Sequence, residues 1–214
     1  MTGTWVFLIY TVPAQPSRKR TFIWRELKKL GVVYLRDGVC ALPERPDTVT
    51  ATRMIAAKVG GFGGQATVVE GGRLDPERAE AISAESRADR AAEYREVGAA
   101  AAQHLAYLRG EPSHRELATA ELAALETDVE KLKRWLGQVR SRDYFGSEGA
   151  GTAALLIGEC ESALGVLLEG AQGASGEQRP NGRARVVPRT GRGRTTALPP
   201  KGSWAELGGA NGGG

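Results

Sequence analysis

Apolar and polar positions follow a strand and helix pattern over the first 72 residues. Four short runs are rich in β-branched and aromatic residues, a composition that favours strands. These runs are Trp5–Val12, Val32–Leu35, Val39–Leu42 and Ala66–Val69. Between them, apolar residues three and four apart predict amphipathic helices over 17–30 and 47–59. Ser17 and Asp47 stand where they could cap these helices, and Gly31 stands where the first helix should end.

The connection between the second and third predicted strands is a tight turn. Asp37 and Gly38 separate two apolar runs, and this dipeptide is typical of a hairpin in which both central residues have positive φ. The predicted element order is therefore β-α-β-β-α-β, which is the order of the ferredoxin-like fold. We expect an α+β head over residues 1–72, with a four-stranded antiparallel sheet and both helices on one face.

The pattern changes to long amphipathic helices over residues 73–169. Asp75 with Pro76 and Ser113 with Glu116 are typical helix starts, and a third helix is expected from about Glu148. The middle helix carries an apolar seam of alternating fours and threes, at Ala118, Leu122, Leu125, Val129, Leu132, Leu136 and Val139. The helices can pack against one another, or this seam can pair with a second copy of the chain. The heptad spacing favours a homodimer through the seam.

The last part of the chain, residues 170–214, has a different composition. From residue 171 onward it contains 11 Gly and 4 Pro in 44 residues, with few large apolar side chains. Such a segment cannot bury enough apolar surface to fold, so we expect a disordered tail. Its arginines could hold nucleic acid without specificity, although a merely solubilising tail is the simpler interpretation. These arginines are Arg183, Arg185, Arg189, Arg192 and Arg194.

Composition excludes several classes of protein. Two cysteines, Cys40 and Cys160, are too few for a disulfide framework or a Cys-rich zinc site. The longest apolar stretch, Trp5–Tyr10, is too short to span a bilayer, and the N-terminus lacks the pattern of a signal peptide. We therefore expect a cytoplasmic protein with reduced thiols, no membrane contact and no cofactor.

Charge is unevenly distributed along the chain, which a formal net charge of +4 conceals. Residues 1–72 carry ten basic and five acidic side chains, residues 73–169 carry twelve and eighteen, and residues 170–214 carry seven and two. A basic head favours a polyanionic partner such as nucleic acid. The alternative is a solvated surface that pairs with the acidic middle of the chain or of a second copy.

The positive charge of the head is concentrated on its first predicted helix, away from the apolar stripe of Ile23, Leu27 and Leu30. A helix about 20 Å long can follow several phosphates, and Arg pairs bidentately with phosphate or another oxyanion. The candidate DNA- or oxyanion-binding residues on this helix are Arg18, Lys19, Arg20, Arg25, Lys28 and Lys29, and the aromatic Trp24 is interleaved with them. The alternative is a solvated helix face on which Trp24 folds onto a neighbouring helix.

Two further charged residues, Arg36 and Asp37, flank the tip of the predicted hairpin. Arg36 joins the candidate DNA- or oxyanion-binding residues, because a side chain at such a tip could contact an effector. A turn-forming Asp beside a solvated Arg is the plainer interpretation, and the sequence favours it.

One stretch of the head resembles a known family. From Arg20 to Pro43 the chain reads RTFIWRELKKLGVVYLRDGVCALP, which resembles the N-terminal domain of the chromate resistance protein ChrB. The matching positions are Trp24, Arg25, Leu27, Lys28, Leu30, Gly31, Leu35, Arg36, Asp37, Gly38, Val39, Leu42 and Pro43. Downstream, Arg90–Tyr94 and Arg142–Phe145 resemble the helical segment of that family, so the resemblance covers about residues 4–169.

The resemblance implies a cytoplasmic transcriptional regulator of a chromate efflux operon, with chromate as its effector. Full-length members of the family carry a further C-terminal domain, and we expect no counterpart of it in this sequence. We therefore expect a DNA-binding regulator or its stand-alone N-terminal module. The alternative is a non-enzymatic interaction module that pairs, through the helical seam, with a separate protein carrying the C-terminal domain.

Enzymatic activity is not expected. Small nucleases of similar fold hold a metal ion with an Asp at the end of the first strand, whereas that end is Tyr10–Pro13 here. His104 and His114 lie ten residues apart without clustered ligands, so we expect structural roles and no metal site. Cys40 and Cys160 lie in apolar runs, which indicates buried and inert thiols rather than redox sensors.

Overall fold

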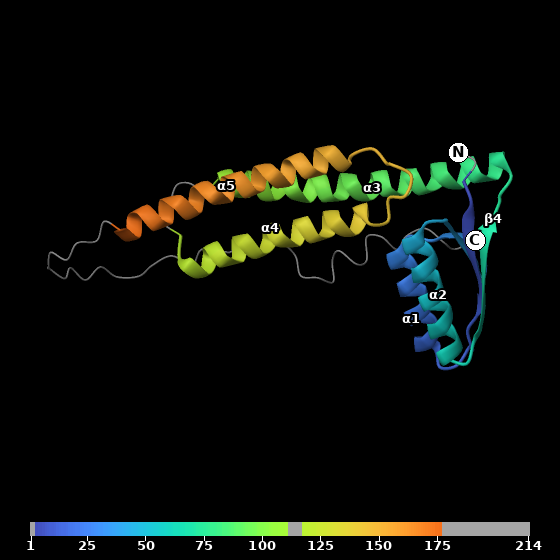
Figure 1. Ribbon diagram of the computed structural model, residues 1–214. Coiled ribbons are helices and arrows are strands. Elements are labelled where there is room, and N and C mark those ends of the chain that lie inside the picture. The colour runs from blue at the N-terminus through green and yellow to red at the C-terminus, as the bar shows by residue number, and fades with distance from the viewer. Residues whose placement is uncertain (1–2, 111–116, 177–214) are drawn as a thin grey trace, which may run out of the picture.

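The structure, a computed structural model, describes residues 3–110 and 117–176. The described chain forms an α+β head followed by three long helices (Figure 1). The predictions made for Ser113, Glu116 and His114, and those for the tail from residue 177 onward, lie outside the described residues.

The head is built on a four-stranded antiparallel sheet. Its strands are β1 (Trp5–Thr11), β2 (Val33–Arg36), β3 (Val39–Pro43) and β4 (Gln65–Gly72). With α1 (Ser17–Leu30) and α2 (Pro46–Gly61) between them, the predicted order β-α-β-β-α-β is confirmed. The strand order β2-β3-β1-β4 places β1 in the interior, where Leu8 pairs with Cys40 of β3 and Val68 of β4. This position explains why β1 is apolar almost throughout.

Both predicted helix caps of the head are wrong. Ser17 is the first residue of α1, and the cap position belongs to Pro16, whose side chain makes no capping hydrogen bond. At the start of α2, the Arg45 N–H donates to Thr48 Oγ1 at 2.9 Å. Asp47 lies inside the first turn of α2, where its carboxylate favours the positive end of the helix dipole without capping it.

Glycines end α1 and turn the hairpin between β2 and β3. Gly31 has φ 73° at the end of α1, as predicted. In the hairpin, only Gly38 has positive φ, at 71°, so the predicted positive φ at Asp37 is wrong. A register shift between Tyr34 and Arg36 accommodates this turn. Only the glycine adopts the left-handed conformation, so Asp37 does not bear the steric strain of a positive φ.

The two head helices cover one face of the sheet, as predicted. Ile23 and Leu27 of α1 and Val59 of α2 are buried against Leu8 and Cys40 of the sheet. Figure 1 shows α1 and α2 side by side against the strands. This packing fixes which side of α1 faces inward and leaves its opposite side to solvent.

The other face of the sheet is covered in part by α3 (Pro76–Arg109). Ala79 and Ile82, in its first turns, pack against Trp5 and Ala41 of the sheet. Asp75 caps this helix, accepting a hydrogen bond from the Arg78 N–H at 2.8 Å, as predicted. The same helix then leaves the head and enters the bundle, so head and bundle share one continuous element (Figure 1).

The bundle consists of α3, α4 (Thr119–Arg140) and α5 (Ala150–Gly176). The last helix continues beyond residue 169, the predicted end of the helical segment. Ala118, predicted to begin the seam, is the exposed N-cap residue of α4, so that part of the prediction is wrong. The rest of the seam is buried within the chain, with Leu122, Leu125, Val129, Leu132, Leu136 and Val139 all in the core. Self-association through this seam is therefore wrong, because α3 and α5 already cover it. A dimer stays a prediction that would need another surface.

One helix, α5, is long and apolar enough between Ala150 and Ala171 to cross a membrane, by length and composition alone. Its stripe of Ala153, Ile157 and Leu164 is buried in the bundle, but only 22% of the apolar window is buried, and Leu155 and Val166 are exposed. The absence of membrane contact stays a prediction.

Candidate nucleic-acid interface

The arginines of α1 lie on its solvent side. Ile23 and Leu27 turn inward and are buried, so Arg18 and Arg25 stand on the opposite side of the helix and are exposed. Within residues 3–110 and 117–176, neither guanidinium has an ion pair, and neither does that of Arg20. These three arginines therefore keep their positive charge available to a ligand.

The lysines of α1 are used differently from its arginines. Lys29 pairs with Glu26 at 3.1 Å, and Lys58 of α2 pairs with the other oxygen of the same carboxylate at 2.6 Å. Hydrogen bonds first from Lys58 and then from Lys29 lower the pKa of Glu26. Lys19 donates to the Phe62 carbonyl oxygen at 3.1 Å and so ties α1 to the end of α2. Of the predicted basic residues, Lys19 and Lys29 are thus partly committed to the fold.

Two aromatic side chains interrupt the basic surface. Trp24 is 45% exposed, and the Lys28 ammonium lies 4.7 Å from its ring centroid. Phe22, on another side of the helix, is 40% exposed and meets the ring of Phe62 edge to face, with 5.6 Å between centroids. The alternative in which Trp24 folds onto a neighbouring helix is therefore wrong. A flat apolar surface stays accessible among the positive charges.

A groove of about 850 Å³ opens beside this surface. It is lined by the start of α1, the end of β1 and the hairpin tip, through Tyr10, Thr11, Val12, Ser17, Arg20, Thr21, Trp24, Asp37 and Gly38. The groove brings the predicted Arg20 together with Trp24 and Asp37. Arg36 is exposed at the same hairpin but is not among the lining residues.

Sequence reasoning missed this groove because it depends on a contact between distant segments. The Tyr10 N–H donates to the Gly38 carbonyl oxygen at 2.7 Å and fixes the hairpin tip beside the end of β1. A Cβ at Gly38 would lie 2.5 Å from the Tyr10 oxygen, so glycine is required there for space as well as for its φ. The sequence shows Gly38, but it does not show that Gly38 packs against the backbone of Tyr10.

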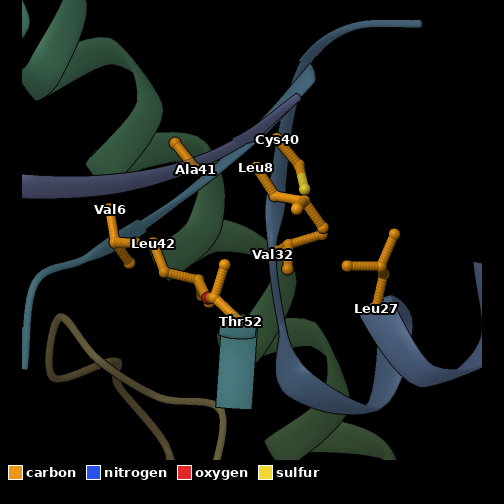
Figure 2. A pocket seen from close by; sticks show the side chains of 8 residues that line it. All are labelled: Val6, Leu8, Leu27, Val32, Cys40, Ala41, Leu42 and Thr52. Atoms are coloured by element: carbon orange, nitrogen blue, oxygen red, sulfur yellow. The ribbon is translucent and has the colours of Figure 1, made fainter. Parts of the chain in front are cut away.

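Both cysteines are buried, as predicted. Figure 2 shows Cys40 among apolar side chains that include Leu8, Val32 and Leu27, in a space with no room for a water molecule. Burial raises the pKa of the Cys40 thiol to about 12. Burial also raises the pKa of Cys160 to about 11, and its Sγ contacts the Ala101 carbonyl oxygen at 3.3 Å. Thiols with such pKa values are protonated at neutral pH and poorly reactive.

The described part of the chain offers no group of three or more His, Cys, Asp or Glu residues placed to hold a metal ion. His104 is buried in the bundle, and its Nε2 has no hydrogen-bond partner among the described residues. Burial lowers the pKa of His104, and nearby Asp128 opposes that shift. A neutral structural histidine fits these surroundings.

Residues 141–149 connect α4 to α5 and form a joint between head and bundle. The Tyr144 hydroxyl donates to the Leu30 carbonyl oxygen, at the end of α1, at 2.7 Å. Phe145 lies beside Trp5 of the sheet, with 5.9 Å between ring centroids. Gly31 is packed so closely on Arg142 that an added Cβ would lie 2.9 Å from the Arg142 Cβ. The joint thus holds the C-terminal end of α1.

The joint also connects the two downstream segments that carry the family resemblance. Arg142 pairs with Glu93 at 2.9 Å, and Arg90 pairs with the other oxygen of that carboxylate at 3.0 Å. The Tyr94 hydroxyl donates to Asp143 at 3.1 Å. These partly buried contacts between α3 and the joint give the two segments a shared structural role.

Comparison with known proteins relates both parts of the molecule to one family. The family described as "Protein ChrB, N-terminal" matches residues 20–169, which include most of the head, the joint and most of the bundle. Protein ChrB of Cupriavidus metallidurans is 27% identical over 187 residues, covering 86% of this chain and 52% of that protein. The chain therefore spans about half the length of this relative. No solved structure matches the chain.

Proposed function

Because the chain belongs to the family of ChrB N-terminal domains, we propose that it is a regulatory protein of chromate resistance that binds DNA through α1. In this proposal the head is of the ferredoxin-like type, and the whole chain acts as a transcriptional regulator of a chromate efflux operon or as its N-terminal module. Chromate is its effector by family resemblance alone, and the protein works in the cytoplasm without catalysing a reaction.

The observation that carries the DNA-binding proposal is the state of the α1 arginines. Arg18, Arg20 and Arg25 are exposed, and in the described ranges no carboxylate pairs with them. The single acidic residue of α1, Glu26, is already paired with Lys29 and Lys58. A phosphate backbone approaching this side of the helix would meet unpaired guanidinium groups and no free carboxylate of α1.

The joint supports the same proposal by holding the helix in place. α1 is fixed by its buried stripe on the sheet and by the hydrogen bond from Tyr144 at its C-terminal end. A helix held at both its face and its end loses little further backbone entropy on binding, so the remaining entropic cost is that of ordering the arginine side chains. Contacts to phosphates can then position the protein on a duplex.

The proposal is tested by binding of the full chain to a labelled duplex from upstream of its own gene, followed by fluorescence anisotropy. Replacing Arg18 and Arg25 together with Ala is expected to weaken binding by roughly tenfold, about 1.4 kcal/mol for two phosphate contacts. The matched control replaces Arg78 and Arg95, two exposed arginines of α3, with Ala and removes the same charge. Equal affinities for the two double variants would reject α1 as the DNA-binding surface.

The alternative, a module that pairs with a separate C-terminal-domain protein, cannot use the surface predicted for it. The seam of α4 is buried against α3 and α5, so such a partner would need to bind elsewhere on the chain. Co-purification of a second chain, together with no duplex binding by this one, would favour the alternative. A homodimer is also part of the proposal, and sedimentation of the purified chain tests it.

A further inference from the structure

The groove beside α1 is an open hollow on the surface with room for a small ligand. Its volume of about 850 Å³ falls within the range of roughly 300–1,000 Å³ typical of small-ligand pockets. The apolar space around Cys40 in Figure 2, by contrast, has no room for water. Of these two spaces in the described part of the chain, the groove beside α1 is the one with room for a ligand.

Three kinds of chemical group meet in this groove. The indole of Trp24 supplies a half-exposed ring, and the Lys28 ammonium lies over it at 4.7 Å from the centroid, so a base would stack on the opposite ring face. Arg20 supplies a guanidinium with no ion pair in the described part of the chain. Asp37 supplies a carboxylate that is likewise unpaired there. Hydroxyl groups complete the lining, and that of Thr21 already donates to the Ser17 carbonyl oxygen at 3.3 Å.

This combination matches a nucleotide better than a free oxyanion. An ion such as chromate or phosphate would leave most of the groove empty, would not use the indole, and would be repelled by Asp37. Any of the four bases can stack on an aromatic ring, and the phosphate of the same nucleotide can pair with an arginine. A carboxylate in the same groove can accept a hydrogen bond from an amino group on the base edge.

We propose that the groove receives an unpaired base of the nucleic acid that α1 holds; this inference rests on the proposed function. A base inside a duplex is stacked and paired, so the ligand is single-stranded DNA or RNA, or a base turned out of a duplex. Trp24 stacks on the base, Arg20 pairs with its phosphate, and Asp37 accepts from its amino group. Arg18 and Arg25, on another side of α1, hold the flanking backbone.

Asp37 gives the groove a preference among bases. A carboxylate only accepts hydrogen bonds, so it favours the N4 amino group of cytosine and disfavours the O4 acceptor of thymine at the same place. The groove is therefore expected to bind oligo(dC) at least about fivefold more tightly than oligo(dT). Replacing Asp37 with Asn, which also donates, should remove most of this difference.

The test compares labelled oligo(dC), oligo(dT) and the upstream duplex, bound to the full chain and followed by fluorescence anisotropy. Trp24→Leu is expected to weaken oligo(dC) binding by roughly tenfold and to leave duplex binding within about twofold. Phe22→Leu is the matched control, because it removes another half-exposed ring of α1 that does not line the groove. Circular dichroism confirms that each variant is folded.

The outcomes separate this inference from the function on which it rests. Loss of oligo(dC) binding in Trp24→Leu but not in Phe22→Leu, with loss of the cytosine preference in Asp37→Asn, supports the groove. Duplex binding that depends on Arg18 and Arg25, together with single-strand binding that ignores Trp24, overturns the groove and keeps the DNA-binding helix. Failure of the wild-type chain to bind any of the three probes overturns both.

Discussion

The lysines of α4 in the bundle and the arginines of α1 in the head differ in whether carboxylates pair with them. In the bundle, Lys133 lies between Glu130 and Glu161 at 2.8 Å from each, and Lys131 pairs with Asp128. On α1 of the head, the arginines have no ion pair among the described residues. A count of charges along the chain does not distinguish basic side chains that are paired with carboxylates from those that are unpaired. Exposed arginines without an ion pair among the described residues also occur on α3, at Arg78 and Arg95. The comparison therefore teaches that unpaired charge clustered on one helix beside an exposed aromatic ring, rather than the number of charges, distinguishes a surface suited to a polyanion.

The two regions also differ in the kind of apolar side chain that they expose. The stripe of α4 is buried within the chain, while Trp24 and Phe22 of α1 remain half exposed. The bundle has exposed apolar side chains too, Leu155 and Val166 of α5, but these are aliphatic. The head leaves both charge and aromatic surface open on one helix. Substitutions in the two regions should therefore differ in whether they change stability or ligand binding.

The largest expected effect on stability comes from opening a cavity in the bundle. Leu132→Ala removes a side chain that is 3% exposed, and we expect a loss of about 2–5 kcal/mol in the free energy of unfolding. Leu155→Ala, on the exposed side of α5, is the control and should change that energy by less than about 0.5 kcal/mol. Urea denaturation measures both. A similar loss in the two variants would contradict the bundle core described above.

A smaller effect is expected at the joint, where it tests whether head and bundle form one unit. Asp143 accepts hydrogen bonds from the Tyr94 hydroxyl and from the N–H and hydroxyl of Ser147. Burial opposes ionisation of Asp143, but these bonds prevail and lower its pKa. Asp143→Ala should cost about 1–3 kcal/mol, because it leaves partly buried donors unpaired.

The control for the joint is Asp89→Ala, which removes an exposed carboxylate from α3. Urea denaturation should show a clear loss for Asp143→Ala and almost none for Asp89→Ala. Hydrogen exchange should also become faster at the C-terminal end of α1, which the joint holds. An unchanged hydrogen-exchange rate at the C-terminal end of α1 would show that the joint does not stabilise this part of the head.

The smallest effect concerns the pH dependence of the bundle. Burial lowers the pKa of His104 below its ordinary value of 6.5, so the unfolded chain binds a proton that the folded chain releases. The contribution of His104 to stability is therefore present above pH 6.5 and declines as the pH falls toward its lower folded pKa. His104→Leu should reduce the difference in stability between about pH 7.5 and about pH 5.5. An identical difference in wild type and variant would reject this assignment.

Local chemistry made much of this molecule predictable from its sequence. The alternating apolar runs predicted all four strands, and Gly31 and Asp75 ended and began their helices as expected. The α1 stripe predicted which side of the helix faces the sheet, and therefore which arginines are exposed. These features depend on neighbours within a few residues, which a single sequence displays.

The remaining features depend on residues far apart in the chain. The α4 seam had the spacing of a dimer interface, but a heptad pattern does not state whether its partner lies in the same chain. The groove needed the hydrogen bond between Tyr10 and Gly38, and the joint needed residues 141–149 to reach the end of α1. The spacing of apolar residues predicts that a helix buries one side. Which other segment packs against that side depends on the tertiary fold.

The most direct test of the central claim, that α1 presents unpaired arginines to a polyanion, is the salt dependence of duplex binding. Affinity is measured over a series of salt concentrations for the wild-type chain and for the variant with Ala at Arg18 and Arg25. We predict that log K falls linearly with log salt, and that the slope becomes shallower by about 0.9 for each phosphate that the variant no longer neutralises. Identical slopes for the two proteins would contradict the claim.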